Sequence, residues 1–246
     1  MEFKTALGAE YALISATEPI NKRRWKSIEK AVSTFDPEII LPLDLQPPVE
    51  MEIIPYFPSS RFLPIICANT VSKLLSISNV EKPQRVAGLI DLKATRQPLA
   101  LRLLKEASSV VVLTNEPERY EAFSEEVFES TGAPVLIAEP GSSLSGCSVI
   151  AAPDGVPIEL CSRNFPAVVC AIPVMTRPSF KLFCSLELSL TEELAQLVPL
   201  GIDPVTFFGA LYEKCKISTL EELTASQGRI DGIMTTVAQF AKTVFR

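Results

Sequence analysis

The stretch Arg85–Gly155 decides the fold of this 246-residue chain. It holds four short apolar segments, RVAGLIDL (85–92), SSVVVLTN (108–115), APVLIAE (133–139) and CSVIAAPDG (147–155). The amphipathic segments TRQPLALRLLKEA (95–107) and EPERYEAFSEEVFESTG (116–132) separate the first three. Short apolar strands that alternate with helices are typical of a parallel α/β sheet. The stretch therefore predicts an α/β protein with a Rossmann-like three-layer parallel sheet.

The rest of the chain predicts two further parts. We expect residues 1–84 to form an N-terminal α/β lobe and residues 85–175 to form the Rossmann-like domain. The lobe contains an amphipathic helix over 22–35 and a short helix over 68–78. Seven prolines between residues 36 and 64 exclude continuous helix there and favour short extended pieces.

The last part, residues 176–246, should be a helical segment packed on the Rossmann-like domain. Two extended segments, 157–161 and 167–174, precede it as additional strands, and a third is expected over 180–188. A capping box at Ser189 predicts a helix over 190–198, and Asp203-Pro204 predicts another to about Lys214. Apolar residues from Ile230 to Val244 recur at helical spacing and predict one long C-terminal helix.

Composition and charge exclude several function classes. No apolar run reaches the roughly 18 residues of a membrane span. The first residues lack the basic and apolar regions of a signal peptide, so we expect a cytoplasmic protein. Residues 86–155 hold five Lys and Arg against ten Asp and Glu. An acidic central unit is a poor surface for nucleic acid or for an anionic membrane, and we expect neither as a partner.

Histidine is absent from the sequence, and six cysteines are present. The absence of histidine excludes Ser-His-Asp and Cys-His nucleophiles and any histidine general base. The cysteines form no CxxC motif and lie mostly in apolar segments such as PIICAN and AVVCAI. We interpret them as small buried hydrophobic residues in a reducing compartment, and we predict no metal site.

The run from Pro98 to Arg119, PLALRLLKEASSVVVLTNEPER, resembles the first helix and second strand of a nucleotide-binding Rossmann domain. It is most similar to the C-terminal domain of the shikimate dehydrogenase family, over about 70 of the 246 residues. Thr114, Asn115 and Glu116 stand where that family has an Asn-Arg-Thr-type turn. The later CSVIAAPDG resembles the strand before the loop near the nicotinamide. The resemblance implies an NAD(P)-dependent oxidoreductase.

The loop after the first strand departs from this pattern. A dinucleotide site needs glycines there, because they let backbone N–H groups approach the pyrophosphate at a helix N-terminus. Here the loop is Asp91–Gln97, DLKATRQ, which contains no glycine. Asp91 and Lys93 fall where the first two glycines would be, and a carboxylate repels a pyrophosphate. Lys93 and Arg96 could still attract a smaller anion, although an ordinary solvated loop explains them better.

Three hypotheses follow from these observations. In the first, the chain is a Rossmann-like binding, sensing or assembly module that has lost dinucleotide binding and is not an enzyme. In the second, it is an NAD(P)-dependent oxidoreductase with a variant loop, in which Lys73 is the acid/base group. Thr114 and Asn115 would then lie near the adenosine ribose and Asp154 beside the nicotinamide. We favour the first, and therefore predict no cofactor.

In the third hypothesis, the carboxyl ends of the strands hold a small molecule without redox chemistry. The crevice at the point where the strand order reverses survives loss of the glycine loop. Its predicted walls contain seven polar residues: Asp91, Lys93, Thr95, Thr114, Asn115, Glu116 and Asp154. Three carboxylates make this mouth acidic, which favours a cationic or polyhydroxyl ligand over a phosphate.

The C-terminal helices are candidates for a homodimer interface. Phe207, Phe208 and Leu211, and the stripe from Ile230 to Val244, are apolar enough to form one. Such residues more often form part of a protein core. The expectation of a dimer through these helices rests on analogy with dehydrogenase-like folds.

Overall fold

A computed structural model describes residues 1–15, 20–32, 40–41, 61–139 and 141–245. The chain divides into two compact units. One consists of Met1–Phe62 with Leu190–Leu220, and the other of Leu63–Ser189 with Glu221–Arg246. This division differs from the three consecutive segments expected from the sequence, because each unit is built from two separate stretches of chain.

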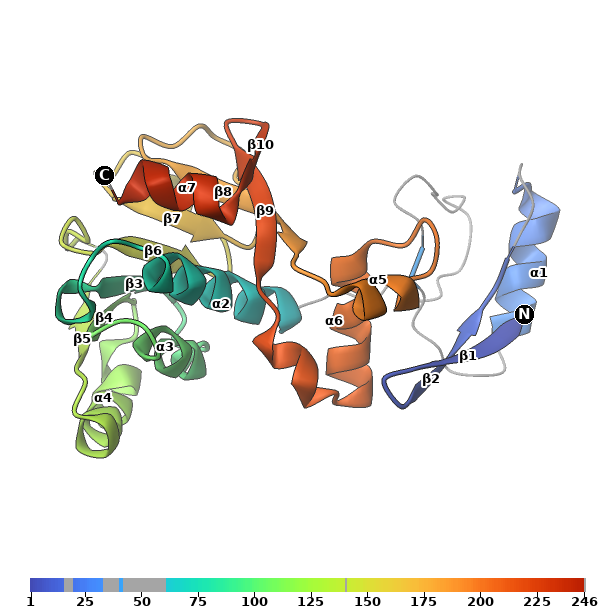
Figure 1. Cartoon of the computed structure of the whole chain (residues 1–246), viewed down its shortest axis with the longest axis horizontal. Coiled ribbons are helices and arrows are strands. Elements are labelled where there is room, and N and C mark those ends of the chain that lie inside the picture. The colour runs from blue at the N-terminus through green and yellow to red at the C-terminus, as the bar shows by residue number, and fades with distance from the viewer. Residues whose placement is uncertain (16–19, 33–39, 42–60, 140, 246) are drawn as a thin grey trace. The chain divides into compact units, whose positions relative to one another are not determined.

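The larger unit is organised around an eight-stranded sheet (Figure 1), in the order β10-β9-β8-β7-β6-β3-β4-β5. Six strands are parallel: β3 (Val86–Ile90), β4 (Ser109–Leu113), β5 (Val135–Ala138), β6 (Val149–Ala152), β7 (Ala167–Cys170) and β8 (Leu182–Leu188). Their order, third-second-first-fourth-fifth-sixth, is that of dinucleotide-binding doubly wound sheets. The α/β, Rossmann-like prediction is therefore confirmed. The order reverses between β3 and β6.

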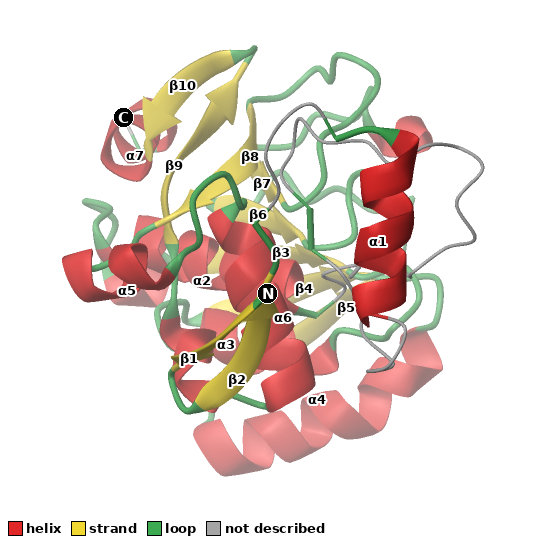
Figure 2. Cartoon of the chain, turned by 90° about the vertical axis from the view of Figure 1, so that its right-hand side faces the viewer, coloured by secondary structure: helices red, strands yellow, loops and turns green. Residues whose placement is uncertain are grey.

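Helices cover one face of the sheet, which we call the helical face. The helices of this unit are α2 (Phe62–Ser76), α3 (Gln97–Leu104), α4 (Pro117–Thr131) and α7 (Val237–Val244). α3 contacts β3 and β4, and α4 contacts β5. At the other end of the sheet, Phe240 of α7 stacks on Phe183 of β8 with ring centroids 4.7 Å apart. In Figure 2 the β9–β10 hairpin and α7 lie together at that end.

Loops cover the opposite face, which we call the loop face. The connections that follow β5, β6 and β7 contain one 3-10 turn, η2 (Ile158–Leu160), and no α-helix among their described residues. Leu144, Cys147, Leu160 and Phe165 from these loops form a buried core with Ile150 and other strand residues. The prediction of a strand over 157–161 is wrong. Ile158–Leu160 forms a 3-10 turn, which places Leu160 in this core. The third layer of the fold is therefore a layer of packed loops.

Gly88 in β3 lies beneath this loop layer. A Cβ atom at Gly88 would come within 2.7 Å of Ile150 Cγ1 and 3.3 Å of Cys147 Sγ. The glycine therefore serves close packing between neighbouring strands.

We expect Gly88→Ala to lower the free energy of unfolding by roughly 1–3 kcal/mol, because the central strands cannot move apart to admit a methyl group. Gly146→Ala is the matched control, since nothing lies within 4 Å of a Cβ at that position. Urea unfolding followed by circular dichroism would measure both. Equal stability of the two variants would contradict the packing role of Gly88.

The long helix predicted from Ile230 to Val244 is wrong. The chain instead forms a hairpin of β9 (Ala225–Ile230) and β10 (Ile233–Thr236), and only Val237–Val244 is helical. Asp231 and Gly232 make the turn with φ values of 49° and 82°. Such a two-residue Asp-Gly turn is a strong hairpin signal. The apolar positions also fit a 3.6-residue period, which is why they suggest a helix.

The smaller unit contains a hairpin and three helices among its described residues. The hairpin joins β1 (Glu2–Ala6) and β2 (Ala9–Leu13), and the helices are α1 (Lys22–Val32), α5 (Glu192–Leu197) and α6 (Pro204–Cys215). Asp203 caps α6 as predicted, accepting a hydrogen bond from Thr206 N at 2.8 Å. Phe207 packs edge-on against Tyr11, and Phe208 and Leu211 are buried beside it. These apolar residues form core, and the homodimer stays a prediction.

Several predicted boundaries are displaced. Thr191, and not Ser189, caps α5. Ser218–Glu222 is a 3-10 turn, η3. α2 is longer than the expected 68–78 and includes Pro64, which the first turn of a helix tolerates because its N–H would have no helical partner there. The extended pieces expected before residue 61 and the last turn of the helix expected over 22–35 lie outside the described residues.

Candidate functional site

Asp91 follows β3 directly, at the edge of the sheet where a dinucleotide-binding fold holds its pyrophosphate. The Asp91 carboxylate accepts hydrogen bonds from two backbone groups, Thr95 N at 3.0 Å and Arg96 N at 2.7 Å. These N–H groups precede the first turn of α3, where a helix attracts anions. Asp91 is only 1% exposed. A side chain of the protein therefore occupies the position of the bound anion.

The tight turn of the loop is made without glycine. Ala94 has a φ of 49°, and its N–H donates to Asp91 O at 3.1 Å. Alanine in this left-handed conformation carries a steric cost that glycine avoids. The hydrogen bonds to Asp91 hold the strained turn in place.

Tyr120 of α4 completes the surroundings of Asp91. Its hydroxyl donates to Asp91 Oδ2 at 2.7 Å, and the side chain is fully buried. Burial is the first cause that raises the pKa of the Tyr120 hydroxyl, and the neighbouring Asp91 raises it further. The hydroxyl is therefore a hydrogen-bond donor at neutral pH and fixes Asp91 from the side of α4.

We expect Tyr120→Phe to lower the free energy of unfolding by about 1–3 kcal/mol, because Asp91 then keeps two of its three donors in a buried place. Tyr120→Leu should cost more, since it also removes the ring from the core. Urea unfolding measures both losses. A Phe variant as stable as the wild type would show that the hydrogen bond to Asp91 contributes nothing.

Arg96 joins the two loops on either side of the point where the strand order reverses. Its Nε and Nη2 donate to Asp154 Oδ2 at 3.0 Å and Oδ1 at 2.6 Å, a bidentate ion pair. Asp154 lies two residues beyond β6 and Arg96 just before α3. We call this pair the Arg96–Asp154 bridge. It spans the crevice that the fold would otherwise open between β3 and β6.

The other predicted site residues lie at the same edge of the sheet. Thr114 is buried, and its hydroxyl accepts from Glu116 N at 3.1 Å. Asn115 N donates to Leu92 O, which ties the end of β4 to the Asp91 loop. Lys93 is exposed. Thus the predicted residues meet along one edge, and the loop hydrogen bonds engage several of them.

Lys73, the acid/base candidate of the oxidoreductase hypothesis, and two other polar residues of α2 have structural roles. Asn69 Nδ2 donates to Glu221 O at 2.6 Å and Leu223 O at 2.8 Å. Thr70 Oγ1 accepts from Ala225 N, and Lys73 Nζ donates to Thr224 Oγ1 at 3.3 Å. All three hold the chain that leads into β9. These contacts explain the presence of Asn69, Thr70 and Lys73 without a catalytic role.

Three of the buried cysteines, Cys67, Cys147 and Cys170, are poor nucleophiles. Burial raises the pKa of the Cys147 and Cys170 thiols to about 11 each, and it raises the pKa of Cys67 as well. A thiol reacts as its thiolate, so these groups are inert at neutral pH. Among the described residues, no three Cys, Asp or Glu side chains gather where they could hold a metal ion.

These thiols make the protein sensitive to alkali. The unfolded chain ionises them near the ordinary value of 9.0, whereas Cys147 and Cys170 stay protonated in the folded protein up to about pH 11. Their contribution to stability is complete below pH 9 and is lost as the pH rises through 11. We expect the free energy of unfolding to fall in that range by up to about 1.4 kcal/mol per pH unit for each group.

Urea titrations at pH 8 to 11 would measure the fall. Cys147→Ala should make it shallower, whereas Cys215→Ala should not, because Cys215 is exposed in the folded protein. A stability independent of pH between 9 and 11 would contradict the expectation.

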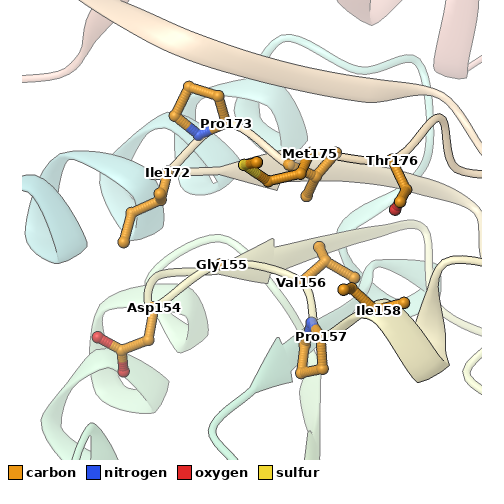
Figure 3. Close-up of a pocket in the computed structure, with 10 residues that line it drawn as sticks. Asp154, Gly155, Val156, Pro157, Ile158, Ile172, Pro173, Met175 and Thr176 are labelled. Carbon is orange, nitrogen blue, oxygen red and sulfur yellow. The ribbon is translucent and has the colours of Figure 1, made fainter.

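A small pocket opens beside Asp154 (Figure 3), with a volume of about 260 Å³. Two facing loops line it, residues 154–158 after β6 and residues 172–176 after β7. In Figure 3, Asp154 and Ile172 lie at one end and Ile158 and Thr176 at the other. Apolar side chains form most of the walls.

Sequence reasoning missed two residues of this edge. The sequence suggests Arg96 only as a group that attracts a small anion, and it does not single out Tyr120. A tyrosine among buried helix positions signals that its hydroxyl needs a partner. No comparable signal pairs Arg96 with Asp154, which lie 58 residues apart.

No protein-family model matches the chain, and no curated protein matches it in sequence. None of the described helices is long and apolar enough to cross a membrane.

Proposed function

We propose that the protein is a non-catalytic ligand-binding or assembly module, built on a Rossmann-like scaffold that has lost dinucleotide binding. The observation that carries the proposal is the Asp91 carboxylate on the N–H groups of Thr95 and Arg96. A bound pyrophosphate would need these two N–H groups as donors. It would instead meet the buried, negatively charged carboxylate of Asp91.

Two further features support the proposal. The Arg96–Asp154 bridge spans the crevice in which a dinucleotide would lie. The groups that could perform chemistry are few: histidine is absent, burial raises the pKa values of Cys67, Cys147 and Cys170, and Lys73 is engaged with Thr224. These features favour binding over catalysis.

Dinucleotides should leave the protein unaffected. We expect the melting temperature of the wild type to be the same with and without 1 mM NAD(H) or NADP(H), because a ligand that binds the folded state must stabilise it. A rise of several degrees would reject the proposal in favour of an NAD(P)-dependent oxidoreductase.

The role of Asp91 has a separate test. Asp91→Ala removes the internal anion and leaves the N–H groups of Thr95 and Arg96 with the Tyr120 hydroxyl around the vacated space. We expect phosphate to restore part of the stability that this variant loses, and to leave the wild type unchanged. Sodium chloride at equal ionic strength is the control. Equal effects of phosphate on both proteins would show that Asp91 does not occupy an anion site.

A further inference from the structure

The loops around the 260 Å³ pocket expose an unusual amount of apolar surface. Ile158 is 68% exposed, Ile172 51% and Met175 99%. All three line the pocket, together with Val156 and two prolines. Contiguous exposed apolar groups around a hollow are typical of binding sites, whereas single exposed ones are ordinary. The pocket therefore offers walls for an apolar group.

The charge at this pocket is negative at one end. Among the residues that the structure describes, Asp154 is the one ionisable side chain that lines it, and in Figure 3 its carboxylate lies at the end away from Met175 and Thr176. Nearby Arg177 is directed to Asp231, with 3.7 Å between Nη2 and Oδ1. An apolar cleft that ends in a carboxylate matches a ligand with an apolar body and a cationic head.

The Arg96 guanidinium already shows that this carboxylate takes a cation. The Arg96 side chain is 23% exposed and the Asp154 side chain 49%, so water reaches the pair and reduces its net contribution to stability. The Asp91 loop does not depend on the pair, because Asp91 holds the backbone N–H of Arg96 and not its side chain. A competing cation can therefore displace the guanidinium while the loop stays in place.

We propose that this pocket binds a small organic cation, with its apolar body between the two loops and its ammonium group on the Asp154 carboxylate in place of Arg96. This inference deepens the proposed binding function and rests on it. The volume is just below the roughly 300–1,000 Å³ of drug-sized sites, so the ligand has the size of a small amine. Binding would open the Arg96–Asp154 bridge and release the Arg96 side chain.

The test compares benzylamine with benzyl alcohol, which has a similar shape and no charge. The reporter is the Met175 methyl signal in protein labelled at methionine methyl groups, assigned with Met175→Leu. We expect benzylamine to shift this signal and to bind at least about tenfold more tightly than benzyl alcohol, since hydrogen bonds to charged groups are the stronger ones.

Three variants make the test specific. Asp154→Asn should abolish the preference for benzylamine. Arg96→Gln should tighten benzylamine binding by roughly two- to fivefold, because the competing exposed ion pair is gone. Glu159→Gln makes the same change of charge at an exposed neighbour and should leave the preference intact.

The inference is overturned if neither probe shifts Met175, if both bind equally, if Asp154→Asn keeps the preference, or if Arg96→Gln weakens binding. NADH titrated into the same wild-type sample separates the two proposals. A response to NADH contradicts the loss of dinucleotide binding, whereas the ratio between benzylamine and benzyl alcohol reports on the cation site alone.

Discussion

The buried carboxylate of Asp91 is the constraint on which the carboxyl edge of the sheet depends. It accepts from two backbone N–H groups before α3 and from Tyr120 of α4, so it ties β3 to both neighbouring helices. A buried carboxylate is stable only when hydrogen bonds replace the lost water, and here three donors converge on it. The strained turn at Ala94 is one consequence of this arrangement.

The same interaction engages the N–H groups at the start of α3. In a dinucleotide-binding sheet, a glycine loop leaves the N–H groups at the helix N-terminus open to a phosphate. Here the carboxylate of Asp91 accepts the hydrogen bonds of these N–H groups. The loop keeps its geometry, and its donors are engaged within the protein. The strand order of a dinucleotide-binding sheet is therefore present, while a side chain of the protein engages these donors.

The loop layer forms an accessible pocket beside Asp154. In the second half of the sheet, the connections are loops packed on the core by Leu144, Leu160 and Phe165. These loops rise beyond the ends of β6 and β7 and form the pocket beside Asp154. The Arg96–Asp154 bridge lies between this pocket and the Asp91 loop, and it is partly exposed. The buried Asp91 carboxylate and the partly exposed Arg96–Asp154 bridge thus lie on the two sides of the point where the strand order reverses.

The parallel core and the absence of glycine from the loop after β3 follow from the sequence alone. Alternating strands and helices from Val86 to Ala152 carry strong local signals, and the missing glycines can be read directly. Asp91 was correctly placed at the edge of the sheet, but its role as an internal anion depends on Tyr120, 29 residues away. Local patterns cannot specify which distant hydroxyl or guanidinium a side chain will meet.

The form of the second half depends on long-range pairing as well as on one local signal, the Asp231-Gly232 turn. The apolar positions between Ile230 and Val244 fit a helical period, yet the Asp231-Gly232 turn and pairing with β8 convert the first of them into strands. Pairing along a sheet edge satisfies backbone groups over a long distance in sequence, and this outweighs a local period. The pocket beside Asp154 likewise exists only because β6 and β7 are neighbours, which brings two loops of separate sequence face to face.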